Sequence, residues 1–117
     1  MVLRCLIVDD SEAFLASASR LLSAQGLEVV GRASSGDAAL QLAQELQPDV
    51  ALVDIQLGNE DGLELTRQLA ADARETRIIL ISTHSEDELT ELVVDSPAVG
   101  FLPKASLSAN AIAELLR

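Results

Sequence analysis

The stretch Val50-Ala51-Leu52-Val53-Asp54 sets a short apolar run directly before an acidic residue. Three further apolar runs end in the same way at Asp9-Asp10, at Ser82 and at Lys104: Leu6-Ile7-Val8, Ile78 to Ile81 and Val99 to Pro103. Short apolar, β-branched runs between helical patterns are typical of parallel strands that are covered on both faces. The stretch therefore predicts a buried strand whose carboxyl end carries a functional carboxylate.

Strand and helix patterns alternate five times along the chain. The expected strands are Leu3–Val8, Glu28–Ala33, Val50–Val53, Arg77–Ile81 and Val99–Leu102. The expected helices are Glu12–Ala24, Asp37–Leu46, Leu63–Ala71, one that Ser85 and Glu88 cap and that ends near Val94, and one from about Ser106. This alternation predicts an α/β protein with a flavodoxin-like doubly wound five-stranded parallel sheet, strand order 2-1-3-4-5, and five helices.

Helical spacing also predicts which side chains face inward. In the first helix the inward face is expected to carry Phe14, Ala18, Leu21 and Leu22, and Gly26 is expected to stop the helix. The core must be aliphatic, because the sequence has two Phe, no Tyr and no Trp.

The charge of the chain limits its partners. With 19 acidic and 8 basic residues, the net charge is −11, so nucleic acid and anionic membranes should repel this domain. No apolar stretch approaches the length of a membrane span, and the N-terminus does not look like a signal peptide. The single cysteine, Cys5, lies in the first strand and excludes a disulfide within the chain, which suits a reducing cytoplasm.

The predicted topology brings the strand ends together. Strands one and three are neighbours at the switch point of this fold, so Asp9, Asp10 and Asp54 should converge in one crevice. Ser82 and Lys104 follow the next two strands at the same edge. Three carboxylates, one hydroxyl and one ammonium can together hold a divalent metal ion and a phosphoryl group.

Four motifs carry a resemblance to a known family, in this order along the chain: Val8-Asp9-Asp10-Ser11, Asp54-Ile55-Gln56-Leu57 followed by Asp61-Gly62, Ile81-Ser82-Thr83, and Gly100-Phe101-Leu102-Pro103-Lys104. The chain resembles a bacterial two-component response-regulator receiver domain over nearly its whole length. Each motif alone is weak, whereas all of them in order and at the family's spacing are a strong signal.

The resemblance implies a role for each site residue. Asp54 would be the phospho-acceptor, and Mg²⁺ would be held by Asp9, Asp10, Asp54 and the backbone carbonyl of Gln56, in keeping with the oxygen preference of that ion. Lys104 and Ser82 would contact the phosphate, and Ser82 with Phe101 would form the switch that remodels the face of the fourth helix, fifth strand and fifth helix. Such a domain promotes its own phosphorylation and dephosphorylation and is not a turnover enzyme.

The resemblance also implies partners. A sensor histidine kinase would be the phosphodonor, with the first helix, including Phe14, near enough to take part in docking. The natural continuation could be a DNA-binding, transcription-regulating output domain, with a stand-alone receiver as the other reading. A homodimer could form through the fourth-helix, fifth-strand and fifth-helix face or through the first and fifth helices.

Two departures from the family pattern keep other readings open. Gly58 stands where many members have proline, which should loosen the loop after Asp54, and Ala105 follows Lys104 where many have a proline that is often cis. An unphosphorylated pseudo-receiver that acts only in docking is therefore one alternative.

A metal-dependent phosphohydrolase is another alternative, but Gln56 stands where haloacid-dehalogenase-type enzymes carry their acid/base aspartate. In a flavodoxin, Asp9 and Asp10 would repel the flavin phosphate.

Overall fold

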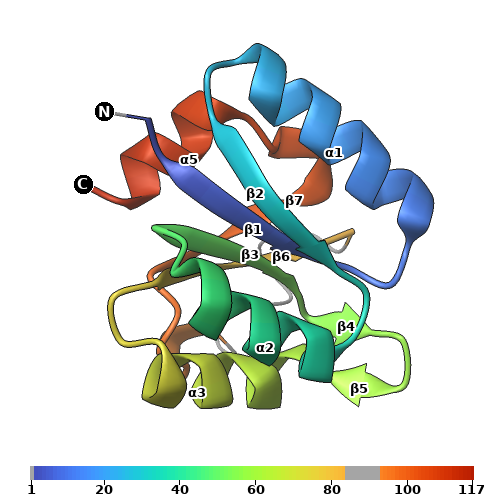
Figure 1. Cartoon of the computed structure of the whole chain (residues 1–117), viewed down its shortest axis with the longest axis vertical. Coiled ribbons are helices and arrows are strands. Elements are labelled where there is room, and N and C mark those ends of the chain that lie inside the picture. Colours follow the sequence, from blue (N-terminus) through green and yellow to red (C-terminus); the bar gives the residue numbers. More distant parts are fainter. Residues whose placement is uncertain (1, 84–92) are drawn as a thin grey trace.

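The protein is a parallel sheet between two layers of helices (Figure 1). The computed structural model describes residues 2–83 and 93–117. The sheet contains β1 (Arg4–Val8), β2 (Glu28–Ala33), β3 (Val50–Asp54), β6 (Arg77–Ser82) and β7 (Gly100–Pro103). The helices are α1 (Glu12–Ala24), α2 (Gly36–Leu46), α3 (Gly62–Asp72) and α5 (Ala109–Leu115), with a 3-10 turn, η1 (Lys104–Ser106).

The five-stranded sheet has the order β2-β1-β3-β6-β7, with every pair parallel. This is the predicted order 2-1-3-4-5, because the labels β4 (Gln56–Leu57) and β5 (Glu60–Asp61) belong to a separate two-stranded hairpin. The α/β, flavodoxin-like prediction is thus confirmed. Most of the predicted fourth helix, including Ser85 and Glu88, lies outside the described residues, as does His84. Only its end is described, and Val93 and Val94 are helical there, near the expected end at Val94. The other four α-helices are described in full.

Alternation along each strand divides the core in two. Ile7, Leu52 and Ile79 point to one face of the sheet and pack with α1 and α5, while neighbouring side chains point to the other face and pack with α2 and α3. Figure 1 shows these two helical layers above and below the sheet. Every residue of β3 is buried, as expected for a central strand covered on both faces.

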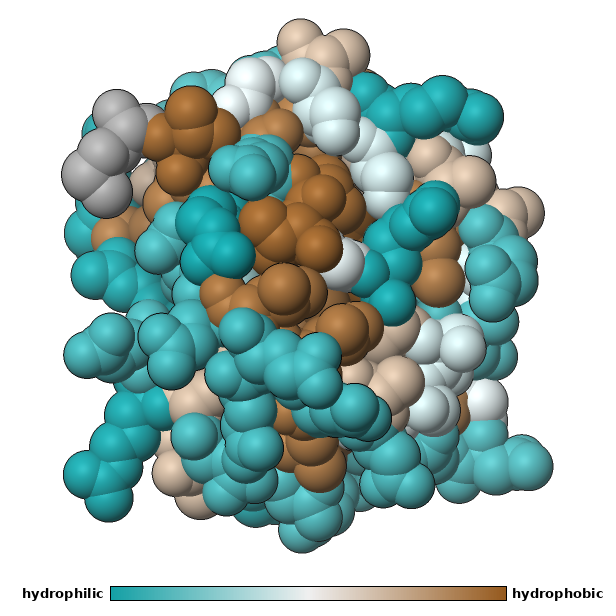
Figure 2. Space-filling model, viewed as in Figure 1, coloured by the Kyte–Doolittle hydropathy of each residue, from teal (hydrophilic) through white to brown (hydrophobic). Residues whose placement is uncertain are grey.

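The surface of the protein carries both apolar and hydrophilic residues. Figure 2 shows apolar residues in the middle of one face, over the edge of the sheet at β2, with hydrophilic residues around them. In the parts of the chain that are described, no helix has the length and apolar character needed to cross a membrane.

The helix ends are set by local sequence. Ser11, Ser35, Asp61 and Ser108 each stand before a helix and accept a hydrogen bond from a backbone N–H of its first turn. At the end of α1, Gly26 has φ +97° and Leu27 N–H donates to the Leu22 carbonyl at 3.0 Å. This closing turn confirms Gly26 as the stop, since positive φ costs glycine little.

Two predictions on the elements were wrong. Leu21 is 41% exposed, because the buried stripe of α1 runs through Leu15, Ala18 and Leu22 and Leu21 lies about 100° away from Leu22. The last α-helix begins at Ala109 rather than near Ser106, because Ser108 Oγ accepts from the Ala111 N–H at 3.0 Å. The last strand begins at Gly100, one residue after its approximate expected start at Val99.

The segment after Asp54 was expected to be a loosened loop, but it forms the antiparallel hairpin β4-β5. Leu57 pairs with Glu60 across a two-residue turn in which Gly58 has φ +61°. Asn59 does not share this positive φ, so the turn is of type II′, which places glycine first. Proline could not take Gly58's place, because its ring fixes φ near −65°.

Candidate functional site

Sheet register brings the first two carboxylates together. Val8 is paired with Val53, so Asp9 and Asp54 leave neighbouring strands at the same level. Backbone donors then orient them: Ser11 N–H donates to Asp9 Oδ1 at 2.8 Å, and Gln56 N–H donates to Asp54 Oδ1 at 3.0 Å. Each carboxylate is thereby fixed by the turn that follows its own strand, and its second oxygen remains directed into the site.

Asp9, Asp10 and Asp54 form one acidic cluster. One carboxylate oxygen from each lies within 4.8 Å of the others, with Asp9 and Asp54 buried and Asp10 exposed. Three carboxylates so close repel one another, and a hard divalent cation that prefers oxygen ligands would relieve that repulsion. The chemistry of the cluster therefore fits Mg²⁺, and the exposed Asp10 leaves a side open to solvent.

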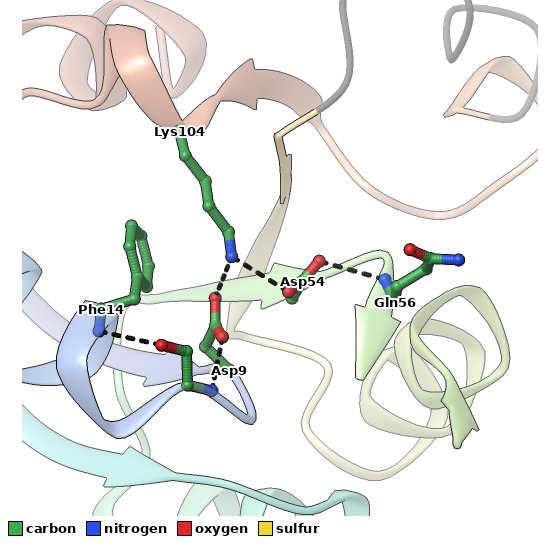
Figure 3. Close-up of polar contacts among 6 residues, drawn as sticks. Asp9, Phe14, Asp54, Gln56 and Lys104 are labelled. Carbon is green, nitrogen blue, oxygen red and sulfur yellow. Dashed lines mark hydrogen bonds and ion pairs between the residues drawn. The ribbon is translucent and has the colours of Figure 1, made fainter. Parts of the chain in front are cut away.

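Lys104 is the cation in this site. Its Nζ lies 2.5 Å from Asp9 Oδ2 and 3.1 Å from Asp54 Oδ2, and its side chain is 16% exposed. Figure 3 shows the side chain descending from the end of β7 between the two carboxylates. Within the described ranges, this ammonium is the only polar partner of the buried Asp9 Oδ2. One ammonium against three carboxylates leaves the site net negative.

Burial and hydrogen bonding together set the pKa values of Asp54 and Lys104. Burial raises the pKa of Asp54 above its ordinary value, although the Gln56 N–H and Lys104 oppose that rise. Burial also lowers the pKa of Lys104, but its hydrogen bonds to Asp9 and Asp54 outweigh burial and leave that pKa raised. Lys104 thus stays charged, whereas burial disfavours the charged form of Asp54.

The two predicted switch residues lie on β6 and β7, the strands that follow β3 in the sheet. Ser82 is buried at the end of β6 and is opposite Pro103, next to Lys104. Phe101 is opposite Leu80 and is only 8% exposed, in the core on the α2 and α3 side of the sheet. Because Leu80 and Ser82 are two residues apart, Ser82 and Phe101 belong to the same face of the sheet.

The two departures from the family pattern do not displace the cluster. An added Cβ at Gly58 would lie 3.6 Å from Asp10 Oδ2, so the hairpin turn borders the acidic cluster. No peptide bond within residues 2–83 or 93–117 is cis, so the bond between Lys104 and Ala105 is trans. Lys104 nevertheless reaches both carboxylates.

Sequence reasoning placed Phe14 near the site, for docking, and quoted Gly62 as part of a motif, but it missed how the two residues shape the site. The Phe14 ring lies beside Lys104, with the ring centroid 4.4 Å from Nζ. Gly62 lies so close to the end of β3 that an added Cβ would be 2.0 Å from the Asp54 carbonyl oxygen. The only signals were an aromatic residue in the first turn after Asp9-Asp10 and a glycine following Asp61, and neither is specific without the fold.

Comparison with known proteins identifies the family. The sequence model of the response regulator receiver domain matches residues 5–117, so the chain belongs to that family. Receiver domains are signalling proteins rather than turnover enzymes, and they bind Mg²⁺ at an acidic pocket such as the one that Asp9, Asp10 and Asp54 form.

Individual relatives agree with this placement. The transcriptional regulatory protein LiaR of Bacillus subtilis is 34% identical over 99% of this chain and 55% of its own length. The signal receiver domain of NarL from Mycobacterium tuberculosis is 33% identical, with a TM-score of 0.84 over 98% of this chain and 94% of that one. A Burkholderia pseudomallei response regulator is 28% identical, with a TM-score of 0.83 over 97% of this chain and 66% of that one. The chain spans about half the length of the curated relatives it matches.

Proposed function

We propose that this chain is a phosphorylation-controlled domain in which Asp54 accepts a phosphoryl group from a sensor histidine kinase. The observation that carries the proposal is the position of Asp54, at the end of the central strand, with two further carboxylates and one ammonium around it. The Burkholderia pseudomallei relative was solved with a phosphorylated aspartic acid and a calcium ion, which supports the same chemistry here.

The transfer asks the protein mainly for position and charge. The carboxylate of Asp54 attacks phosphorus, the bond from phosphorus to the kinase imidazole nitrogen breaks, and the imidazole leaves with that electron pair. Asp9, Asp10, Asp54 and the Gln56 carbonyl would hold Mg²⁺, which neutralises the phosphoryl oxygens when it is bound. Lys104 would exchange its carboxylate contacts for a phosphate oxygen, and Ser82 would donate its hydroxyl to another.

The added charge of the phosphoryl group on Asp54 would change the surface that faces a partner. Ser82 and Phe101 would respond together and alter the face built on β7 and α5. Phosphorylation would thus shift the equilibrium between two arrangements of that face. Because the matched relatives are about twice as long and include a transcriptional regulator, we propose a DNA-binding output domain as the controlled partner, in the cytoplasm. The acidic domain itself would not bind nucleic acid.

Intact mass after incubation with Mg²⁺ and acetyl phosphate tests the proposal. Wild type should gain one phosphoryl group, about 80 Da, and the gain should vanish with Asp54→Asn or with EDTA. Asp72→Asn is the matched control, because it removes the same charge from an exposed residue at the end of α3. A folded wild type that binds Mg²⁺ but gains no mass would contradict the proposal and favour the docking-only alternative.

A further inference from the structure

An aromatic ring flanks the ammonium of the site. Phe14 lies in the first turn of α1, and Ser11 Oγ accepts from its backbone N–H at 3.2 Å, which fixes the residue next to Asp9. Its ring centroid is 4.4 Å from Lys104 Nζ, within the range of a cation–π interaction. Figure 3 shows the ring standing beside the Lys104 side chain, on the side where α1 begins.

The anionic partners of Lys104 are two of the three carboxylates that could hold a metal. Asp9 Oδ2 and Asp54 Oδ2 hold the ammonium, and both residues belong to the acidic cluster. A divalent cation among these carboxylates would repel the ammonium and compete with it for their negative charge. Lysine is a point charge on a flexible four-carbon stem, so loss of these contacts alone would leave it unconstrained.

The ring supplies a constraint that survives this competition. A phenyl face attracts a cation through its quadrupole, carries no net charge and offers no ligand to a metal. We propose that Phe14 is a positioning residue that keeps the Lys104 ammonium at the site when Mg²⁺ occupies the carboxylates. The proposal rests on the phosphoryl-accepting function above, because its purpose is to leave the ammonium ready for a phosphate oxygen.

The contact can be observed directly, because Lys104 is the only lysine in the chain. Protein labelled with ¹³C- and ¹⁵N-lysine gives one ε-methylene signal, which the ring should shift upfield. Phe14→Leu should abolish this ring-current shift and Phe14→Tyr should retain it. The shift should persist at saturating Mg²⁺. Its disappearance when Mg²⁺ binds would overturn the proposal, whether or not the protein accepts phosphate.

The effect on the reaction is measured without a kinase, so that partner docking plays no part. With acetyl phosphate and saturating Mg²⁺, Phe14→Leu should slow phosphorylation about five-fold, the factor that corresponds to a cation–π interaction of about 1 kcal/mol. Phe14→Tyr should restore most of the rate. In a Lys104→Met background, Phe14→Leu should cause no further loss, because the ring acts through the ammonium.

The outcomes separate this proposal from the one on which it depends. Thermal melts and Mg²⁺ titrations of each variant identify any loss that comes from unfolding or weaker metal binding. Equal rates for wild type and Phe14→Leu, or an equal further loss in the Lys104→Met background, would overturn the positioning role. An effect seen only with a histidine kinase as donor would also overturn it and make Phe14 a docking residue. If wild type is not phosphorylated at all, the proposed function fails, and the NMR shift alone decides the contact.

Discussion

Asp54 combines two demands that conflict within a single residue. The proposed function requires a carboxylate that can accept a phosphoryl group, yet Asp54 is 7% exposed and lies beside two other acids. Burial raises its pKa above the ordinary 3.8, which means that the metal-free fold disfavours the charge that the chemistry needs. The charged Asp54 carboxylate should therefore destabilise the metal-free protein, and a single substitution can test this.

Asp54→Asn should stabilise the metal-free protein at neutral pH, by roughly 1 kcal/mol. The sign follows from the raised pKa: below both pKa values the carboxyl is neutral whether folded or unfolded, and stability falls as pH rises from the unfolded pKa through the folded one. The advantage of asparagine should therefore be small in acid and grow toward pH 7. Urea unfolding in EDTA across that range measures it. A gain that does not change with pH would rule out charge as the cause.

Cys5 provides a second test at the scale of one residue. Burial raises the pKa of this thiol to about 12, and the side chain has no exposed surface. Since only the thiolate is nucleophilic, the folded protein should react with a disulfide reagent at pH 8 at least a thousand-fold more slowly than the urea-unfolded chain. Release of the reagent's coloured thiol gives both rates. Fast labelling of the folded protein would show that β1 opens locally.

At the scale of elements, α3 approaches β3 so closely that only glycine fits between them. An added Cβ at Gly62 would lie 2.0 Å from the Asp54 carbonyl oxygen and 2.7 Å from that of Ile55, and both obstacles are backbone. Gly62→Ala should therefore cost roughly 3 kcal/mol and should weaken Mg²⁺ binding, because relief requires the end of β3 to move.

Gly31→Ala is the matched control for that prediction. The nearest atoms to its added Cβ are the ends of leucine side chains, Leu46 Cδ1 at 3.0 Å and Leu6 Cδ1 at 3.3 Å, which can shift. Urea unfolding and Mg²⁺ titration of both variants make the comparison. Equal costs in stability, with Mg²⁺ binding intact in both, would contradict the importance of this close approach for the site.

The start of α5 can be tested in the same way. Ser108 Oγ accepts from the Ala111 N–H, whereas Ser106 ends the 3-10 turn and is exposed. Ser108→Ala should lower the free energy of unfolding by about 1 kcal/mol, the usual cost of losing an N-cap. Ser106→Ala should change it by less than half of that. If Ser106→Ala proved the more costly, the helix would begin where the sequence alone had suggested.

These elements show what a sequence can and cannot specify. The strands were predictable because buried parallel strands are apolar throughout, and the acidic cluster was predictable because their carboxyl ends share one edge. The hairpin β4-β5 was not, since two-residue strands carry no periodicity and Gly58 alone suits many turns. The Phe14 contact depends on how α1 lies against β7, a tertiary relation that no local pattern encodes.

At the scale of the whole molecule, the net charge of −11 should make added NaCl stabilising, because counterions screen self-repulsion. Specific Mg²⁺ binding must be separated from this general effect. At a Mg²⁺ concentration ten times its Kd, specific binding should add about 1.4 kcal/mol to the free energy of unfolding, beyond NaCl at equal ionic strength.

Two variants of equal charge test whether the gain in stability from Mg²⁺ arises at the acidic cluster. Asp10 is exposed, so Asp10→Asn should leave the fold intact but remove most of the gain from Mg²⁺ over NaCl. Asp37→Asn, which removes an exposed carboxylate in the first turn of α2, should keep that gain. Thermal melts in matched salts measure both. If the two variants lost the same amount, the ion would be acting on the overall charge of the molecule rather than on the cluster at the strand ends.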